Sequence, residues 1–222
     1  MRIGVISEGH ADRAVITNIL IGLLGIDESD IEPLRPIYAL DETDKALRAD
    51  PRTFGSWSSV KEECEKRELI DGFLAIEGQD FIVIHIDTAE ASEYGITRPD
   101  KRENNYCEEL RALIIAQINT WLEIDISNHI LYAIAVEEID AWILTIYEKT
   151  DSTKTAKPKE RLGRVLSKSG KNSTSNYENY FSISKPLSKP KDIKKGKYLT
   201  YNCSLNAFFE EIHTKVLSKI MG

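Results

Sequence analysis

The stretch DFIVIHIDT, residues 80–88, decides the fold class of this chain. It is a short, nearly continuous apolar run rich in Ile and Val, which is typical of a strand buried in a parallel sheet. The run ends abruptly in the carboxylate of Asp87. In an open α/β sheet, ligands bind beyond the carboxyl ends of the strands, so Asp87 is predicted to lie where chemistry usually takes place.

Two further apolar runs also end in acidic residues. Residues 2–7 lead directly into Glu8. Residues 129–136 lead into Glu137 and then Asp140. Each of the three predicted strands therefore has an acidic residue at its carboxyl end, which is one recurring pattern. The rest of the chain is interpreted as the scaffold that holds these acidic residues.

In the segments between these runs, apolar residues recur at the spacing of an α-helix. The alternation of strands and helices predicts an α/β fold, Rossmann-like, with a mostly parallel sheet and right-handed crossovers. A weaker candidate strand contains Pro36, which predicts a place near the sheet edge. The expected strands are residues 2–7, 34–40, 81–87 and 129–136, and the expected helices are residues 11–24, 56–70, 103–122, 137–147 and 204–217.

Composition is that of an ordinary globular protein, with 222 residues, 41% hydrophobic and 29% charged. No apolar run approaches the roughly 20 residues needed to span a bilayer. The N-terminus enters a strand at once, so a cytoplasmic protein with no membrane partner is expected. The cysteines Cys64, Cys107 and Cys203 are far apart and show no C-x-x-C spacing. They are interpreted as free thiols rather than as a zinc site or a disulfide framework.

Charge divides the chain into two parts. Residues 149–222 hold 16 Lys and Arg against 6 Asp and Glu, whereas residues 1–148 hold 13 against 30. This asymmetry indicates an anionic partner or a cation site. Mutual attraction of the two parts, or a solvated basic loop, would explain it equally well. The predicted organisation is an α/β domain over residues 1–148, with a basic loop region and a C-terminal helix over residues 149–222 packed on the same domain.

Aromatic side chains, among them Tyr177 and Tyr180, are interleaved with lysines such as Lys159 in the basic part. That composition is typical of a surface that follows a phosphate backbone and stacks on bases. A solvated tail with a few anchoring aromatics is the alternative. The lysines selected as substrate contacts are Lys185, Lys189, Lys195 and Lys197.

The acids at the strand ends point to metal chemistry. Clustered carboxylates repel one another, and a fold retains them together when a cation offsets the repulsion. Oxygen ligands with waters left on the ion suit Mg²⁺ or Mn²⁺, which would serve phosphoryl transfer or phosphodiester cleavage. The sequence contains no G-x-G-x-x-G, Walker A or G-x-S-x-G pattern.

Several of these residues also have ordinary structural explanations. Asp12 opens the helix at residues 11–24, where an acid is favoured by the helix dipole, so it is interpreted either as a cap or as a substrate contact. The same argument applies to Glu137 and Asp140. His10, beside Glu8, could shuttle a proton or contact phosphate, or be an incidental loop residue. His85 alternates into its strand and is interpreted as a satisfied core histidine.

The acidic residues and their spacing resemble the motifs of a known protein family. Glu8-Gly9 with Asp12 resembles the Glu-Gly-x-x-Asp start of the Toprim domain of topoisomerases, primases, recombination proteins and old-family nucleases. The strand ending at Asp87 resembles the Asp-x-Asp strand of that family. Residues 136–144, VEEIDAWIL, resemble the segment of DUF4276-type Toprim-like proteins in which an acid precedes Ala-Trp-Leu-Leu. The resemblance covers residues 1–148.

The resemblance implies a Toprim domain and a Mg²⁺- or Mn²⁺-dependent nuclease acting on DNA or RNA. By that resemblance Asp87 is the principal metal ligand, and Glu8 is a general acid/base or a further ligand. Glu137 and Asp140 are supporting acids. Defence against phage or mobile elements is among the implied roles, with a partner ATPase, and a homodimer is left open.

One departure from the family pattern matters. The second acid of Asp-x-Asp would fall on Ala89, and Glu90 or Glu93 would have to substitute for it as a ligand. If neither does, the alternative is a catalytically degenerate Toprim-like module for nucleic-acid binding or assembly. A small-molecule phosphohydrolase that uses the same acids is a third hypothesis.

Overall fold

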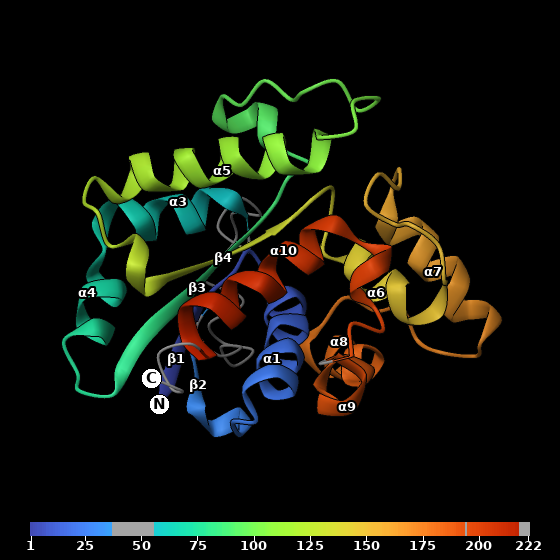
Figure 1. Cartoon of the computed structure of the whole chain (residues 1–222), viewed down its shortest axis with the longest axis horizontal. Helices are drawn as coiled ribbons and strands as arrows, with labels where there is room; N and C mark the ends of the chain where they lie inside the picture. The colour runs from blue at the N-terminus through green and yellow to red at the C-terminus, as the bar shows by residue number, and fades with distance from the viewer. Residues whose placement is uncertain (37–55, 194, 218–222) are drawn as a thin grey trace, which may run out of the picture.

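A computed structural model describes residues 1–36, 56–193 and 195–217 of the chain (Figure 1). Its centre is a four-stranded sheet, all parallel, with strand order β2-β1-β3-β4. Helices flank both faces, so the predicted α/β class with a parallel, Rossmann-like sheet is confirmed. The strands are β1 (Arg2–Ile6), β2 (Ile31–Arg35), β3 (Gln79–Asp87) and β4 (Ile130–Ala135).

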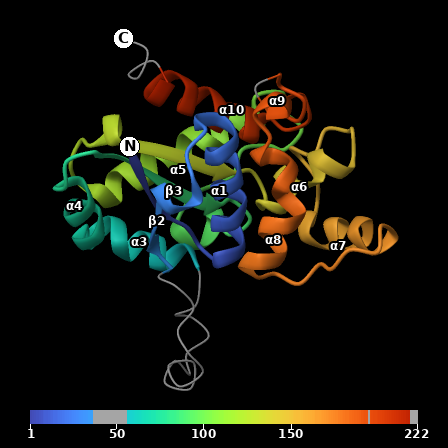
Figure 2. The same cartoon turned by 90° about the horizontal axis from the view of Figure 1, so that it is seen from below.

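Alternation along the strands sends side chains into two separate cores. On β3, Phe81 and Val83 belong to one core, whereas Ile82 and Ile84 belong to the other. Figures 1 and 2 show the corresponding helical layers on opposite faces of the sheet. The first core is covered by α1 (His10–Leu24), α6 (Asp140–Tyr147), α7 (Pro158–Lys168), α8 (Tyr177–Ser184), α9 (Pro190–Ile193) and α10 (Cys203–Ile212), and the second by α3 (Trp57–Lys66), α4 (Glu68–Leu74) and α5 (Tyr106–Leu122).

Helix α1 is buried nearly all round, because it lies between the sheet and the C-terminal helices. Asn18 donates hydrogen bonds to the Phe181 carbonyl (2.9 Å) and to the Ser184 hydroxyl (2.8 Å). A Cβ atom at Gly22 would lie 2.2 Å from the Leu187 carbonyl oxygen. The close approach of the C-terminal segment to α1 therefore requires glycine at this position.

The C-terminal part differs from the predicted basic loop region. It contains α7, α8 and α9 before the closing helix α10. Buried residues such as Leu162, Leu166, Tyr180 and Ile183 join the core on the α1 face. The many Ser, Thr and Lys residues between these apolar positions made the helical spacing hard to recognise in the sequence. Burial of the apolar residues stabilises these helices, although their composition alone does not favour helix formation.

The edge position predicted from Pro36 is confirmed, because β2 is an outer strand of the sheet. The strand itself comes earlier than the expected residues 34–40, at Ile31–Arg35. Residues 37–40 of the predicted strand lie outside the described residues. None of the described helices is both long enough and apolar enough to cross a membrane.

Strand order fixes where a ligand can bind. From β1 the chain goes to β2 on one side, and β3 and β4 lie on the other side of β1. The carboxyl ends of β1 and β3 therefore form the topological switch point, where open α/β sheets have their binding crevice.

Candidate functional site

A pocket of about 690 Å³ opens at this switch point. Four of its carboxylates come from four places in the fold and are called the acid cluster here: Glu8 after β1, Asp12 in α1, Asp87 at the end of β3, and Asp140 at the start of α6. The basic groups that line the pocket are His10, Arg13 and Lys159. The other acids that line it are Glu28, Glu90, Glu138 and Glu178.

Glu8 and Asp87 are held together by a backbone contact. The amide N–H of Asp87 donates to Glu8 Oε1 at 2.7 Å, so the acid after β1 is fixed against the end of β3. Gly9 begins α1 in extended geometry, and a Cβ there would lie 3.2 Å from Asp12 Oδ2. The Glu-Gly-x-x-Asp spacing thus turns both acids towards the same pocket.

Asp87 and Asp140 are each positioned by a hydrogen bond from another segment of the chain. The Ile139 amide donates to Asp87 Oδ1 at 2.9 Å. The Tyr180 hydroxyl, from α8, donates to Asp140 Oδ1 at 2.6 Å. The C-terminal part of the chain therefore orients a carboxylate of the cluster that belongs to the N-terminal part.

Burial raises the pKa of every carboxyl group in the acid cluster. The pKa of Glu8 and that of Asp87 lie well above the ordinary values, because both half-buried groups lose contact with water and face neighbouring carboxylates. Burial, together with nearby Asp87 and Asp140, raises the pKa of Asp12 to about 7. Burial and Glu138 raise the pKa of Asp140. Like charges face one another here, and a bound cation would offset their repulsion.

His85 lies beneath these acids and is fully buried. Its Nε2 atom is 3.3 Å from Asp87 Oδ1, but the contact lacks hydrogen-bond geometry, and neither ring nitrogen has a hydrogen-bond partner within the described part of the chain. Burial lowers the pKa of His85, which favours the neutral imidazole. His85 is a core residue, as predicted, but the prediction that its ring nitrogens are satisfied by hydrogen bonds is wrong. Buried polar groups are normally paired, so an unpaired buried histidine is unusual.

Glu137, predicted as a supporting ligand, lies outside the pocket. Its backbone has a positive φ of 68°, and α6 begins only at Asp140 instead of at residue 137. Glu137 Oε1 is 2.7 Å from an Arg98 nitrogen, 2.8 Å from Lys101 Nζ and 3.0 Å from the Tyr106 hydroxyl. We call these four residues the Glu137 cluster. Burial alone would raise the pKa of Glu137, but the hydrogen bonds from Lys101 and Arg98 outweigh it and hold the pKa below its usual value.

The neighbouring acid, Glu138, lines the pocket in place of Glu137 and accepts a hydrogen bond from the Lys159 amide at 3.1 Å. The two acids predicted as substitutes near Ala89 also differ in position. Glu90 lines the pocket, whereas Glu93 accepts a hydrogen bond from the Trp57 indole at 3.1 Å.

The predicted substrate contacts are divided between pocket and outer surface. His10 and Asp12 line the pocket, as their spacing from Glu8 indicates. Lys159, Asn176 and Tyr177, which were not selected from the sequence, line it too. The sequence feature that pointed to these residues was the basic and aromatic composition of their segment. Composition alone does not identify which lysine lies beside the acids. The four selected lysines are exposed and do not line the pocket: Lys185, Lys189, Lys195 and Lys197.

The acid cluster fits a hard cation held by few protein ligands. No set of three carboxylates in the acid cluster has one oxygen from each lying within 4.8 Å of the other two. Among the described residues, Cys107, Glu108 and Cys203 meet that criterion with their ligand atoms. Magnesium sites in proteins commonly use one or two carboxylates, with waters and substrate phosphate oxygens completing the shell. The donor set and its spacing suit that kind of site.

Comparison with known proteins gives only partial similarity. No family model matches the chain, and no solved structure matches it. GTPase Der of Clostridium perfringens (strain SM101 / Type A) is 27% identical over 125 residues, which are 54% of this chain and 28% of that protein. GTPase Der of Clostridium kluyveri (strain NBRC 12016) is 30% identical over 130 residues, 56% of this chain and 28% of that protein. The chain therefore spans little more than a quarter of the curated relatives that it matches, and these similarities establish no family membership.

Proposed function

We propose that this protein is a Mg²⁺- or Mn²⁺-dependent phosphodiesterase that cleaves DNA or RNA. The observation that carries the proposal is the acid cluster, in which carboxylates from four segments converge in one pocket at the switch point of the sheet. The unpartnered, fully buried His85 beneath Asp87 is a second indication that this place is built for more than packing.

Asp87 with Asp140, or with Glu90, would hold the metal. A bound Mg²⁺ or Mn²⁺ would supply polarisation of a phosphoryl oxygen and a lower pKa for bound water. Glu8 is suited to hold or move a proton, because burial and neighbouring acids raise its pKa towards the working range of a general acid/base. Lys159 adds positive charge at the pocket wall for a phosphate group.

The similarity to GTPase Der carries no proposal of GTP hydrolysis. The phosphate-binding G-x-x-x-x-G-K-[ST] loop does not occur in this sequence. The Toprim-like resemblance supports the nuclease proposal, and with it a role in phage defence beside a partner ATPase. The cytoplasm remains the expected compartment.

A second candidate is a catalytically degenerate module that binds nucleic acid. Ala89 stands where the family pattern has its second acid, and its amide donates to the Glu137 carbonyl at 2.9 Å. Retained nucleic-acid binding without any metal-dependent cleavage would select it.

The test is cleavage of single- and double-stranded DNA and RNA with Mg²⁺, Mn²⁺ or a chelator. The matched variants are Asp87→Asn and Asp80→Asn, which make the same change at opposite ends of β3, Asp80 being exposed. We expect metal-dependent cleavage by the wild type and by Asp80→Asn, and a loss of about 10²- to 10³-fold in Asp87→Asn. Equal rates in the two variants would remove the acid cluster from the reaction. Turnover of nucleotides but not of polymers would select the small-molecule phosphohydrolase.

A further inference from the structure

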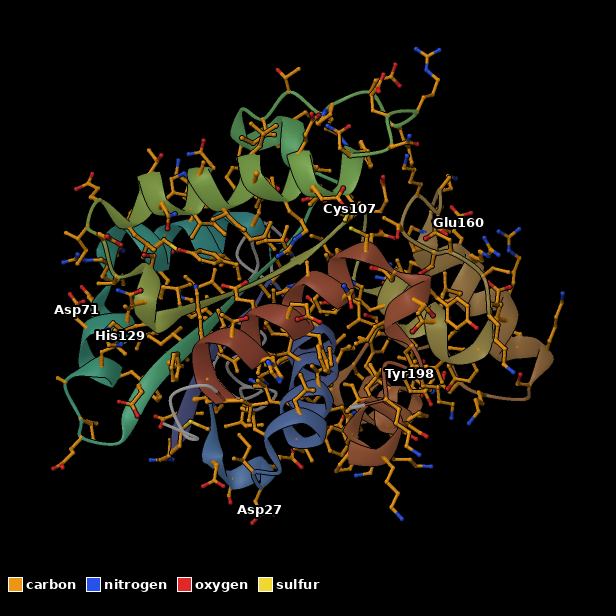
Figure 3. All side chains as sticks on the ribbon, viewed as in Figure 1. Asp27, Asp71, Cys107, His129, Glu160 and Tyr198 are labelled. Carbon is orange, nitrogen blue, oxygen red and sulfur yellow. The ribbon has the colours of Figure 1, made fainter. Side chains whose placement is uncertain are left out.

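Cys107, Glu108 and Cys203 form a second cluster, which shares no residue with the acid cluster and, unlike it, contains sulfur. Their ligand atoms, two sulfurs and a carboxylate oxygen, all lie within 4.8 Å of one another. Cys107 and Glu108 lie in the first turn of α5, and Cys203 is the first residue of α10. Figure 3 labels Cys107 between the ribbons of α5 and α10.

We infer that these three side chains form a binding site for a thiophilic divalent cation of the Zn²⁺ class. Thiolate ligands select such ions over Mg²⁺ and Mn²⁺. The inference is independent of the proposed nuclease function, because the acid cluster contains no sulfur.

The separation of Cys203 Sγ from Glu108 Oε1 suits tetrahedral coordination of one ion. Zinc–sulfur bonds of about 2.3 Å and zinc–oxygen bonds of about 2.0–2.2 Å place the sulfur and oxygen of one tetrahedron about 3.5 Å apart. Cys203 Sγ lies 3.4 Å from Glu108 Oε1. Three protein ligands leave a fourth position for water, and the partial exposure of Cys203 and Glu108 gives an ion access from solvent.

The surroundings hold the ligands in place before an ion arrives. The Cys203 amide donates to the Thr153 hydroxyl at 2.9 Å, and the Asn202 side chain accepts the Leu205 amide at 2.9 Å. These contacts fix the first turn of α10, a helix that also packs against α5. A site on preorganised helix ends loses little freedom when it binds an ion.

Charge around the cluster is compatible with a bound dication. Two thiolates and a carboxylate bring three negative charges, so a dication leaves one. The guanidinium of Arg111 interacts electrostatically with both thiols and with Glu108, and it donates to the Ile134 carbonyl at 3.1 Å. Arg111 also pairs with Glu211, whose carboxylate oxygen lies 4.0 Å from its guanidinium, so it offsets only part of the remaining charge and is not itself a ligand.

The site would join the two helical layers of the fold. Helix α5 covers one face of the sheet and α10 the other, and β4 is the outer strand between them. A cation shared by the two helix starts would fasten the layers around the β4 edge and stabilise the folded chain by mass action.

The test uses the reduced, metal-free full chain titrated with Co²⁺, which gives a thiolate-to-cobalt charge-transfer absorption only when bound to sulfur. The variants are Cys203→Ser and the matched control Cys64→Ser, whose cysteine is buried on α3. We expect a saturable absorption in the wild type and in Cys64→Ser, displaced by Zn²⁺, and its loss in Cys203→Ser. Zn²⁺ should raise the unfolding temperature of the first two proteins and not that of the third.

No thiolate absorption in the wild type would overturn the inference, as would one that Cys203→Ser retains. Loss of two of the three thiols on mild oxidation, in a protein that binds no Co²⁺, would also overturn it and identify the pair as a disulfide former. Asp87→Asn should keep the absorption, so a failed nuclease assay leaves this result unaffected.

Discussion

The acid cluster and the Glu137 cluster lie near the same edge of the sheet but differ in how their charge is balanced. In the Glu137 cluster, Arg98 and Lys101 contact one carboxylate and hold its pKa below the usual value. In the acid cluster, carboxylates face other carboxylates, and their pKa values are raised. An acid that the protein neutralises itself has a structural task, whereas acids left facing one another indicate a cation from outside the chain.

The largest effect expected from this difference concerns catalysis. Glu8→Gln should lower metal-dependent cleavage by about 10²- to 10⁴-fold, because it removes the group suited to proton transfer. Glu137→Gln makes the same substitution in the other cluster and should leave the cleavage rate unchanged. Single-turnover rates at saturating metal are the measurement, and a wild-type rate in Glu8→Gln would exclude Glu8 from the reaction.

The second effect concerns stability, and here the Glu137 cluster is the one expected to respond. Glu137→Gln should lower the free energy of unfolding by about 1–2 kcal/mol near neutral pH, because charge-assisted hydrogen bonds from Arg98 and Lys101 are lost. Both cations are partly exposed, which keeps the cost below that of a fully buried pair.

The pH dependence of that loss follows from the lowered pKa of Glu137. A depressed pKa gives stability that is present above the unfolded-state value, about 4.3 for Glu, and that is lost as the pH falls through the folded-state value. The difference between the wild type and Glu137→Gln should therefore shrink below about pH 4. Urea unfolding at several pH values measures it, and a difference that stays constant into acid would contradict the ion-pair explanation.

A third, smaller effect should appear when the acid cluster loses a charge. Asp12→Asn should raise the free energy of unfolding of the metal-free protein by about 1 kcal/mol at neutral pH, since it removes a carboxyl group whose ionisation is opposed by burial first and by Asp87 and Asp140 second. The same substitution should reduce the stabilisation gained from added Mn²⁺. Thermal unfolding with and without Mn²⁺ tests both statements, and a destabilised metal-free Asp12→Asn would show a capping role instead.

The smallest effect concerns salt dependence. Lys159→Ala should reduce the slope of log affinity for DNA against log salt by about 0.9, the value for one lost phosphate contact. Lys101→Ala removes a lysine from the Glu137 cluster and should not change the slope. Fluorescence anisotropy with labelled duplexes at several salt concentrations would distinguish the two lysines, and equal slopes would place Lys159 away from the phosphates.

Much of this arrangement could be predicted from the sequence, because strand ends in a parallel sheet meet at one edge. That rule was enough for the α/β fold and for the convergence of Glu8, Asp87 and Asp140. It could not separate Glu137 from Glu138, since adjacent residues differ only in backbone direction, and Glu137 adopts a positive φ. Nor could it select Lys159, whose place depends on tertiary packing of α7.

The pocket draws its wall and its acids from different parts of the chain. The acids come mainly from the sheet edge, whereas Lys159, Asn176 and Tyr177 come from the C-terminal helices and the turn between them. Substitutions in the wall leave the strand ends untouched, so the shape and charge of the pocket wall can change without moving the acids of the sheet edge. The Tyr180–Asp140 hydrogen bond limits that freedom, because through it the C-terminal part of the chain holds a carboxylate of the acid cluster.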